Sequence, residues 1–247
     1  MLNQMTIEKL SSMKLRGMSL AFNEQASNPA VKNLSFEERF GLIVDAEWIK
    51  RKNNHLTRLL KKATLKLSGA CIEDIEYHGD RKLNKGIITE LSFCNYVRDK
   101  RNVIVMGASG AGKTFIGCAL GNAACRNLMS TKYIRLPELL TDMEIARGDG
   151  SYKRVLNQYR KYDLLIFDEW LLTPLSIVQA RDLLEIIEAR HQCSSSIFIS
   201  QFAAAGWHLN IGEGTIADAV LDRIVHNSYE ILIEGQISMR ERKSFKK

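Results

Sequence analysis

Residues 107–114, with the sequence GASGAGKT, limit the possible folds of this chain more than any other segment. They follow an apolar run, NVIVM at 102–106, and precede a helical pattern at 115–126. A strand, a glycine-rich turn ending in Lys-Thr and a helix form a P-loop, whose backbone N–H groups and helix N-terminus surround phosphates. The sequence therefore predicts a nucleoside triphosphate site (Walker A) made by Gly107, Ala108, Ser109, Gly110, Ala111, Gly112, Lys113 and Thr114.

Two side chains of this loop and a second motif carry the predicted chemistry. Lys113 can reach the β- and γ-phosphates, and Thr114 presents a hydroxyl to Mg²⁺. In LLIFDE, the apolar run 164–167 leads to Asp168, which would hold Mg²⁺ through water in the Walker B role. The next residue, Glu169, can polarise an attacking water, which favours a hydrolase over a small-molecule kinase. We therefore expect ATP and Mg²⁺ to bind.

Short apolar runs recur along the chain, at 102–106, 132–136, 164–168, 196–200 and 229–233. Their β-branched and aromatic residues indicate strands of a parallel sheet that is covered on both faces. The segments between them are long enough for helices. This alternation predicts an α/β fold with a doubly wound, parallel, five-stranded sheet. We expect Trp170 and Trp207 to pack in its core rather than to stack on bases.

The first part of the chain has a different, helical pattern. Apolar residues are spaced as in a helix over 6–26, and Ser35 with Glu38 forms a capping box before an apolar stripe of Phe36, Phe40, Ile43 and Val44. Between residues 50 and 66 there are seven Lys or Arg and no acidic residue. We predict a helical domain over 1–66 that binds DNA or pairs subunits, a glycine-containing linker over 67–95 and an ATPase domain over 96–247.

The composition restricts the partners and the compartment. A formal net charge of +7 and a pI near 9.1 favour an acidic partner, nucleic acid before membrane. Five cysteines without a CxxC pair indicate reduced thiols rather than a disulfide or zinc framework. Near Met1, charged residues interrupt every apolar run, so we expect no signal peptide, and no stretch of the chain approaches the roughly 20 apolar residues of a membrane helix. We therefore expect a soluble, cytoplasmic protein.

Four segments in order resemble one known family. They are GASGAGKTFIGCALGNAA, YDLLIFDEWLLTPL, SIFISQFAAAGWH and TIADAVLDRIVHNSYEILIEGQISMR. Together they resemble the IstB-like helper ATPases of transposition, which are close to the DnaA and DnaC clade of AAA+ proteins. The resemblance extends over about residues 35–242. A strand at 132–136, between the P-loop strand and the Asp168 strand, is typical of the additional-strand, catalytic-glutamate ATPases.

The resemblance implies further roles for named residues. Ser200 or Gln201, at the end of the fourth strand, would be the sensor-1 residue near the γ-phosphate. Arg223 would be an arginine finger that reaches the ATP of a neighbouring subunit; otherwise it would be a helix arginine paired with Asp218 or Asp222. Because only fourteen residues follow Ile233, the C-terminal lid is expected to be reduced or absent. Arg240 would then substitute for the arginine of the lid.

A basic helical segment at 137–161 is the expected DNA surface. The DnaA clade carries an extra helix at this place, and in helper ATPases it faces DNA. Without a helix-turn-helix or zinc finger, we expect contacts to the phosphate backbone and recognition of DNA shape. The basic residues concerned are Arg147, Lys153, Arg154, Arg160 and Lys161.

The resulting hypothesis is an ATP-dependent regulator. It would form a homo-oligomer on double-stranded DNA and recruit or stimulate a transposase. One alternative is a replicative-helicase loader of the DnaC kind, which shares the motor and differs in its partner. Another is a DNA-binding scaffold that is not a motor and whose ATP site only controls assembly.

Overall fold

The computed structural model describes residues 2–212, 214–235 and 237–243 and divides the chain into two compact units, 1–58 and 59–247. This division differs from the predicted domain boundaries. Residues 67–95, which we expected to be a linker, belong to the second unit, and apolar side chains in this segment, such as Ala70, Ile88 and Leu91, are buried. The segment contains the 3-10 turns η2 (Ile72–Asp74) and η3 (Gly79–Arg81) and the helix α4 (Lys85–Ser92).

The first unit is helical, as predicted. Its elements are α1 (Leu2–Ser12), α2 (Arg16–Ser27), η1 (Pro29–Asn33) and the beginning of α3 (Phe36–Ala63). The helical pattern over 6–26 is therefore two helices and not one, because the chain turns at Lys14, where φ is 61°. The capping box before α3 is confirmed: the Glu38 backbone N–H donates to Ser35 Oγ at 3.2 Å, and the Ser35 N–H donates to the Glu38 carboxylate at 2.7 Å.

One buried carboxylate joins α2 to α3. Glu47 Oε2 accepts hydrogen bonds from the backbone N–H groups of Gly17, at 2.6 Å, and Met18, at 3.2 Å, in the first turn of α2. The Arg51 guanidinium, which donates to Glu47 Oε1 at 2.7 Å, lowers the pKa of the Glu47 carboxyl. The two helices approach so closely that a Cβ atom at Gly17 would lie 2.6 Å from Glu47 Cα.

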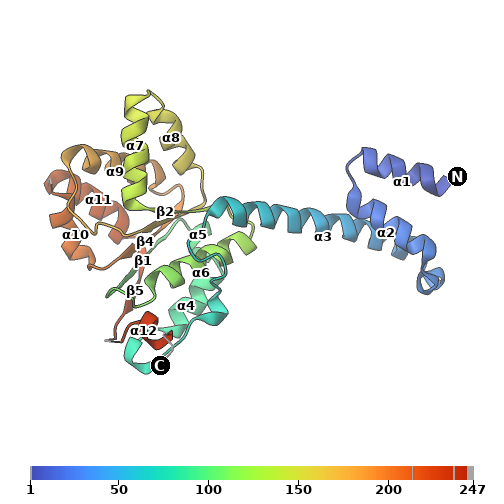
Figure 1. Cartoon of the computed structure of the whole chain (residues 1–247), viewed down its shortest axis with the longest axis horizontal. Helices are drawn as coiled ribbons and strands as arrows, with labels where there is room; N and C mark the ends of the chain where they lie inside the picture. Colours follow the sequence, from blue (N-terminus) through green and yellow to red (C-terminus); the bar gives the residue numbers. More distant parts are fainter. Residues whose placement is uncertain (1, 213, 236, 244–247) are drawn as a thin grey trace. The chain divides into compact units, whose positions relative to one another are not determined.

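The second unit is built on the predicted parallel five-stranded sheet (Figure 1). The strand order is β2-β3-β4-β1-β5, and all pairs of neighbours are parallel. Since every carboxyl end lies at the same edge, the residues that follow the strands collect there. The strands are β1 (Asn102–Gly107), β2 (Thr131–Arg135), β3 (Leu164–Asp168), β4 (Ser195–Ser200) and β5 (Ser228–Ile233).

Helices cover both faces of this sheet (Figure 1). On one face, α6 (Lys113–Arg126) lies so close that Cβ atoms at Gly117 and Gly121 would come within 2.5 and 2.6 Å of Ile199 and Ile166 side-chain atoms. The other helices are α5 (Asn95–Arg98), α7 (Leu136–Gly148), α8 (Tyr152–Arg160), α9 (Ile177–Arg190), α10 (Ala204–Ile211), α11 (Gly214–Val225) and α12 (Met239–Lys243).

The core on the opposite face contains residues of α7, α9, α10 and α11 with the alternate strand positions, such as Phe167 and Phe198. Trp170 and Trp207 are fully buried there, with ring centroids 5.6 Å apart, so the prediction that they pack in the core is confirmed. Among the described residues, no helix combines the length and the apolar composition that a membrane span requires.

Gly17→Ala should loosen the crossing of α2 and α3, because the new methyl group would collide with the α3 backbone. Overpacking of this kind costs about 1–3 kcal/mol. Gly41→Ala is the matched control, since it lies on α3 with no atom within 4 Å of a Cβ. Hydrogen exchange of residues 16–27 should become faster in Gly17→Ala and stay unchanged in Gly41→Ala. Equal protection of this segment in both variants would contradict the close crossing.

Candidate nucleotide-binding site

The glycine-rich segment after β1 forms the predicted P-loop. Gly110 and Gly112 have φ of 79° and 92°, left-handed values that strain any residue with a Cβ atom. Gly112 is the N-cap of α6, which begins at Lys113. The N-terminus of a fourteen-residue helix therefore points at the loop, with its free backbone N–H groups and partial positive charge available to an anion.

Lys113 lies inside the loop and is mostly buried. Its ammonium donates hydrogen bonds to the backbone carbonyls of Gly107 and Ala108, both at 2.8 Å. Burial lowers the pKa of Lys113, whereas the nearby Asp168 raises it. The lysine is thus held at the centre of the loop, where a phosphate group would accept its hydrogen bonds in place of the two carbonyls.

Asp168 receives three hydrogen bonds at the end of β3. Thr114 Oγ1 donates to Oδ2 at 2.9 Å, the Tyr133 hydroxyl donates to the same oxygen at 2.6 Å, and the Glu169 N–H donates to Oδ1 at 2.8 Å. A threonine hydroxyl beside a carboxylate offers the oxygen ligands that Mg²⁺ prefers, so these residues fit the predicted metal. Burial, and then the hydrogen bond to Asp168, raise the pKa of Tyr133.

Glu169 follows Asp168 in a left-handed conformation, with φ of 55°. Its carboxylate is paired with Arg135, whose Nη2 lies 2.6 Å from Glu169 Oε2. Arg135 ends β2 and lies directly opposite Asp168 in the β2–β3 register, and it also contacts Glu138 at 3.2 Å. Arg135 and Tyr133 could not be predicted from the sequence, because β2 and β3 become neighbours only through the strand order of the folded sheet.

The structure distinguishes between the two sensor candidates. Ser200 is buried, and its hydroxyl bonds to the Trp170 carbonyl, the Phe202 N–H and the Trp207 indole, all at 3.1 Å. It therefore holds the chain together after β4. Gln201 is exposed and lines the same cavity as Lys113, Thr114, Asp168 and Glu169. Of the two residues, Gln201 is the one that lines this cavity.

A second, more apolar cavity adjoins the other side of the loop. Gly112, Lys113 and Thr114 line it together with three apolar side chains that the sequence analysis did not select: Leu67, Phe115 and Met239. Such a lining suits the flat base of a nucleotide, which binds through apolar contact more than through charge. The two adjacent cavities could therefore accommodate a base and its phosphates.

Residues from two distant segments contact the loop. Arg81 is buried beside Gly112 and donates from Nη2 to the Ala111 carbonyl at 2.9 Å. Arg242 of α12 pairs with Asp80, and the Met239 N–H donates to the Gly110 carbonyl at 2.9 Å. Arg240 lies in the same helix, but its side chain is outside the described part of the chain, so its predicted role stays a prediction.

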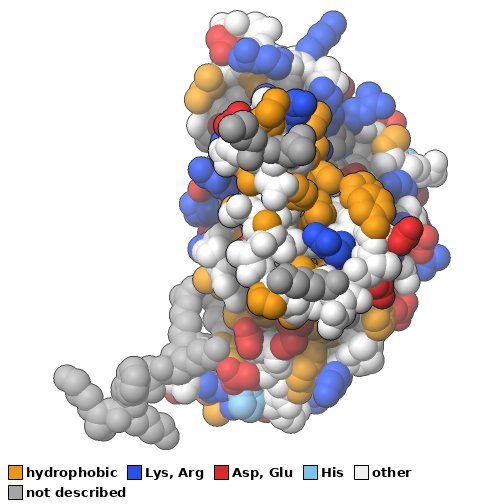
Figure 2. Space-filling view, turned by 90° about the vertical axis from the view of Figure 1, so that its right-hand side faces the viewer, with side chains coloured by type: hydrophobic (Ala, Val, Ile, Leu, Met, Phe, Trp, Pro, Cys, Tyr) orange, Lys and Arg blue, Asp and Glu red, His pale blue; other side chains and the backbone are white. Residues whose placement is uncertain are grey.

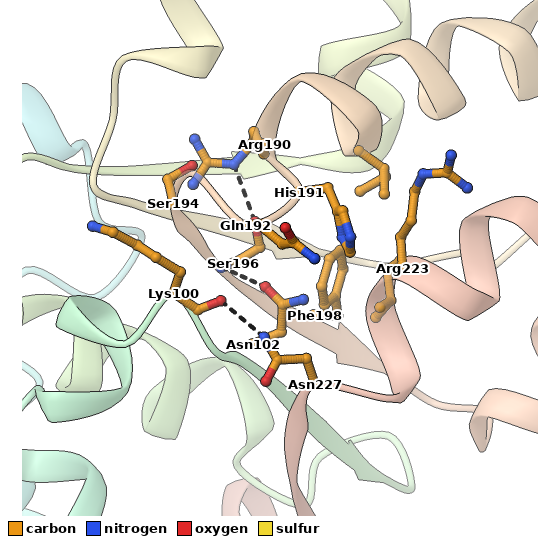
Figure 3. A pocket seen from close by; sticks show the side chains of 12 residues that line it. Lys100, Asn102, Arg190, His191, Gln192, Ser194, Ser196, Phe198, Arg223 and Asn227 are labelled. Atoms are coloured by element: carbon orange, nitrogen blue, oxygen red, sulfur yellow. Dashed lines mark hydrogen bonds between the residues drawn. The ribbon is translucent and has the colours of Figure 1, made fainter.

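Arg223 lies far from the P-loop of its own chain. It is near the end of α11, just before β5, at the edge of the sheet where the strands begin (Figure 3). Its Nη1 donates to the Ala219 carbonyl at 2.8 Å, and its side chain pairs with Glu188 of α9. Asp218 and Asp222 pair instead with His208 and His226. Since the P-loop follows the end of β1, Arg223 cannot contribute to the nucleotide site of the same subunit.

The predicted DNA residues divide into two groups. Arg147 stacks on Tyr152 at 4.4 Å and bonds through Nε to the buried Asp182 at 3.0 Å, which ties the end of α7 to α9. The remaining four, on or just after α8, are exposed: Lys153, Arg154, Arg160 and Lys161. Figure 2 shows several Lys and Arg side chains at the top of the view, at the height of the α7–α8 hairpin in Figure 1.

Known proteins with similar sequences are described as ATP-binding proteins, in agreement with a nucleotide site at the P-loop. The family described as IstB-like ATP binding protein matches residues 8–247. A Sinorhizobium fredii protein named as an insertion sequence ATP-binding protein is 39% identical over 98% of this chain and 99% of its own length. The corresponding protein of insertion sequence IS1162 from Pseudomonas fluorescens is 41% identical over 83% of this chain and 89% of its own length.

Solved structures support the fold alone. DnaI has a TM-score of 0.58 at 19% identity, over 72% of this chain and 93% of that one. AMPPCP-bound DnaA from Aquifex aeolicus has a TM-score of 0.56 at 17% identity, over 66% of this chain and 50% of that one. The second unit therefore has the AAA+ P-loop fold of these neighbours, and the chain belongs to the IstB-like ATP-binding family of insertion sequences.

Proposed function

We propose that this protein is a Mg²⁺-dependent ATPase that assembles on double-stranded DNA and recruits or stimulates the transposase of an insertion sequence. The observation that carries the proposal is the convergence of the P-loop, Asp168, Glu169 and Gln201 on one cavity, in a chain whose family is named for insertion sequences. DNA and ATP meet in the cytoplasm, which is where we expect it to act.

The P-loop would bind the phosphates of ATP. Backbone N–H groups at the start of α6 donate to phosphate oxygens, and the Lys113 ammonium exchanges its two carbonyl partners for the β- and γ-phosphates. Thr114 and Asp168 would hold Mg²⁺, which neutralises charge that develops on the phosphates. Burial favours this exchange, because a desolvated ammonium gains more from a phosphate than from neutral carbonyls.

Glu169 would activate the attacking water, and Gln201 would orient it. In the structure the Glu169 carboxylate is paired with Arg135, so it must leave this partner, or share it, before it accepts a proton. The pair is partly exposed and therefore of moderate strength. We expect this pair to keep the basal rate of ATP hydrolysis low. A contact near β2 that draws Arg135 away from Glu169 would raise that rate.

Arg223 would act on the ATP of a neighbouring subunit. Its own P-loop is at the other edge of the sheet, so only a second copy can bring a nucleotide to its guanidinium. The Glu188 carboxylate and the Ala219 carbonyl hold the side chain meanwhile. A homo-oligomer follows from this role, because each site would be completed by an adjacent chain.

DNA would bind to the exposed basic side chains on and after α8. Within the described residues, none of these four side chains forms an ion pair with a carboxylate. Their charges are therefore available to DNA phosphates. Contacts of this kind give affinity without base specificity. The basic part of α3 is a second candidate surface for DNA or for subunit pairing.

A helicase loader is the second candidate function. The DnaC helicase loader has a TM-score of 0.52 at 15% identity over 66% of this chain, which shows only that the fold is compatible. A pull-down with purified transposase and replicative helicase separates the two functions by the partner retained. A scaffold that is not a motor would bind ATP without turnover.

Hydrolysis should depend on a free Glu169 carboxylate. Glu169→Gln should retain ATP binding and lose most turnover, because an amide cannot accept the proton. Arg135→Ala should act in the opposite direction and raise the basal rate roughly two- to fivefold, as expected from the loss of a partly exposed ion pair. Phosphate release in single-turnover and steady-state assays measures both.

Glu138→Ala is the matched control for Arg135→Ala. It removes the other carboxylate partner of Arg135 and leaves the Arg135–Glu169 pair, so the basal rate should not rise. Turnover of Glu169→Gln at the wild-type rate would exclude Glu169 as the base. A basal rate that falls in Arg135→Ala would show that Arg135 assists hydrolysis instead of restraining Glu169.

DNA affinity should fall steeply with salt and depend little on sequence. Replacing both Lys153 and Arg154 by alanine should flatten the slope of log affinity against log salt by about 1.8, since each lost phosphate contact contributes about 0.9. The control is the double variant Arg98→Ala, Arg101→Ala. Both arginines are exposed and precede β1, so this variant loses the same two positive charges. An unaltered slope in the first variant would place the DNA surface elsewhere.

Arg223 should be required in trans. Arg223→Ala and Lys113→Ala should each abolish turnover, the former with ATP binding nearly intact, since an arginine finger is worth ~10³ or more in rate. Mixing the two should recover part of the activity, because some junctions would join an intact P-loop to an intact Arg223.

The control mixture contains Arg223→Ala and a chain that carries both substitutions. It has no junction with both elements intact and should stay inactive. Native mass spectrometry verifies that the variants co-assemble. Co-assembly without any recovery of activity would assign Arg223 a structural role on α11.

A further inference from the structure

The segment that follows α3 runs beside β2 and α6 and is fixed to both by backbone and side-chain contacts. The Thr64 hydroxyl donates to the Tyr133 carbonyl at 3.3 Å, and Asn122 Nδ2 of α6 donates to the Ala70 carbonyl at 3.0 Å. Between these points, the backbone of residues 66 and 67 lies beside the Cys118 thiol of α6, whose pKa is raised to about 11, chiefly by burial. Leu65 is buried, within 2.9 Å of where a Gly121 Cβ would be.

These contacts position one lysine at the nucleotide site. Lys66 lines the cavity that contains Lys113, Asp168 and Glu169, and it also lines the adjoining apolar cavity beside Phe115. It is therefore located where the two cavities meet. The segment around it is anchored by Thr64, Leu65 and Ala70, whereas its own side chain is exposed and has four rotatable bonds with which to reach a ligand.

The Lys66 ammonium has no hydrogen-bond or ion-pair partner among the residues that the structure describes. The neighbouring cations are already engaged: Lys113 bonds to the loop carbonyls, Arg135 to Glu169 and Lys132 to Thr64 at 3.0 Å. A free cation at a cavity that receives a polyanion gains more from the ligand than an exposed lysine gains from water alone.

We propose that Lys66 is a second phosphate-binding lysine, supplied by the segment after α3, which contacts the γ-phosphate of bound ATP. The γ-phosphate is favoured because Lys66 shares its cavity with Glu169 and Gln201, the residues on the side of the attacking water. The inference rests on the proposed ATP site and adds a residue to it. Lys66 follows the end of α3 by three residues, so binding would also tie the nucleotide to that helix.

The test compares an ATP analogue that is not hydrolysed with ADP, in the presence of Mg²⁺, by calorimetry on the full chain. Lys66→Ala should lower the affinity for the analogue by about 5- to 30-fold and the affinity for ADP by less than about threefold. This is the difference expected for one charge-assisted hydrogen bond to the γ-phosphate. Lys66→Arg should restore most of the difference. Lys62→Ala, an exposed lysine on α3 that lines neither cavity, is the matched control and should bind like the wild type.

Hydrogen exchange provides a second readout of the contact between Lys66 and the nucleotide. The ATP analogue should protect residues 59–70 in the wild type more than ADP does, and this difference should disappear in Lys66→Ala while the P-loop stays protected. An unchanged ratio of analogue to ADP affinity in Lys66→Ala would overturn the inference. So would an equal loss for both nucleotides that Lys66→Arg does not restore, because this is the mark of a structural role.

Lys113→Ala separates this inference from the proposed function. If the wild type binds ATP and Lys113→Ala does not, the ATP site stands whatever Lys66 does. If the wild type binds neither nucleotide, the proposed function fails, and the role of Lys66 fails with it.

Discussion

The parallel pairing of β1, β4 and β3 is the constraint on which the site depends. It brings the P-loop, the residue after β4 and the acidic pair after β3 to one edge of the sheet. The pairing alone would not close the site, because α6 must also lie close to the strands. Gly117 and Gly121 permit this, since any side chain there would collide with Ile199 and Ile166. Thr114, one residue into α6, then reaches Asp168.

Local signals in the sequence were sufficient for most of what is formed by neighbours in the chain. The strands, the P-loop and the Ser35–Glu38 capping box all appear as predicted. The turn at Lys14 is local as well, but the apolar spacing continues across it and gives no sign of it. The segment 67–95 differs from the linker that we expected because its apolar side chains are buried in the second unit, which depends on tertiary context. The Arg135–Glu169 pair could not be predicted before the strand order was known.

The choice between Ser200 and Gln201 also depends on the folded structure. Both are polar residues at the end of a strand, and the sequence gives no reason to prefer one. Alternation across the strand end, together with Trp207, makes the difference: the Ser200 hydroxyl is turned inward to three protein partners, and Gln201 is turned outward to the cavity. A buried hydroxyl that already has its partners has no capacity left for a ligand.

A chain of hydrogen bonds connects the metal-binding carboxylate with the segment after α3. Asp168 is almost fully buried and would be costly without donors, and the Tyr133 hydroxyl is one of the three it receives. The backbone carbonyl of the same tyrosine accepts the Thr64 hydroxyl. Tyr133 thus links Asp168 to Thr64, which lies two residues before Lys66. This connection, with the burial of Ala63 and Leu65, explains why the end of α3 and the residues after it fold with the second unit although α3 begins in the first.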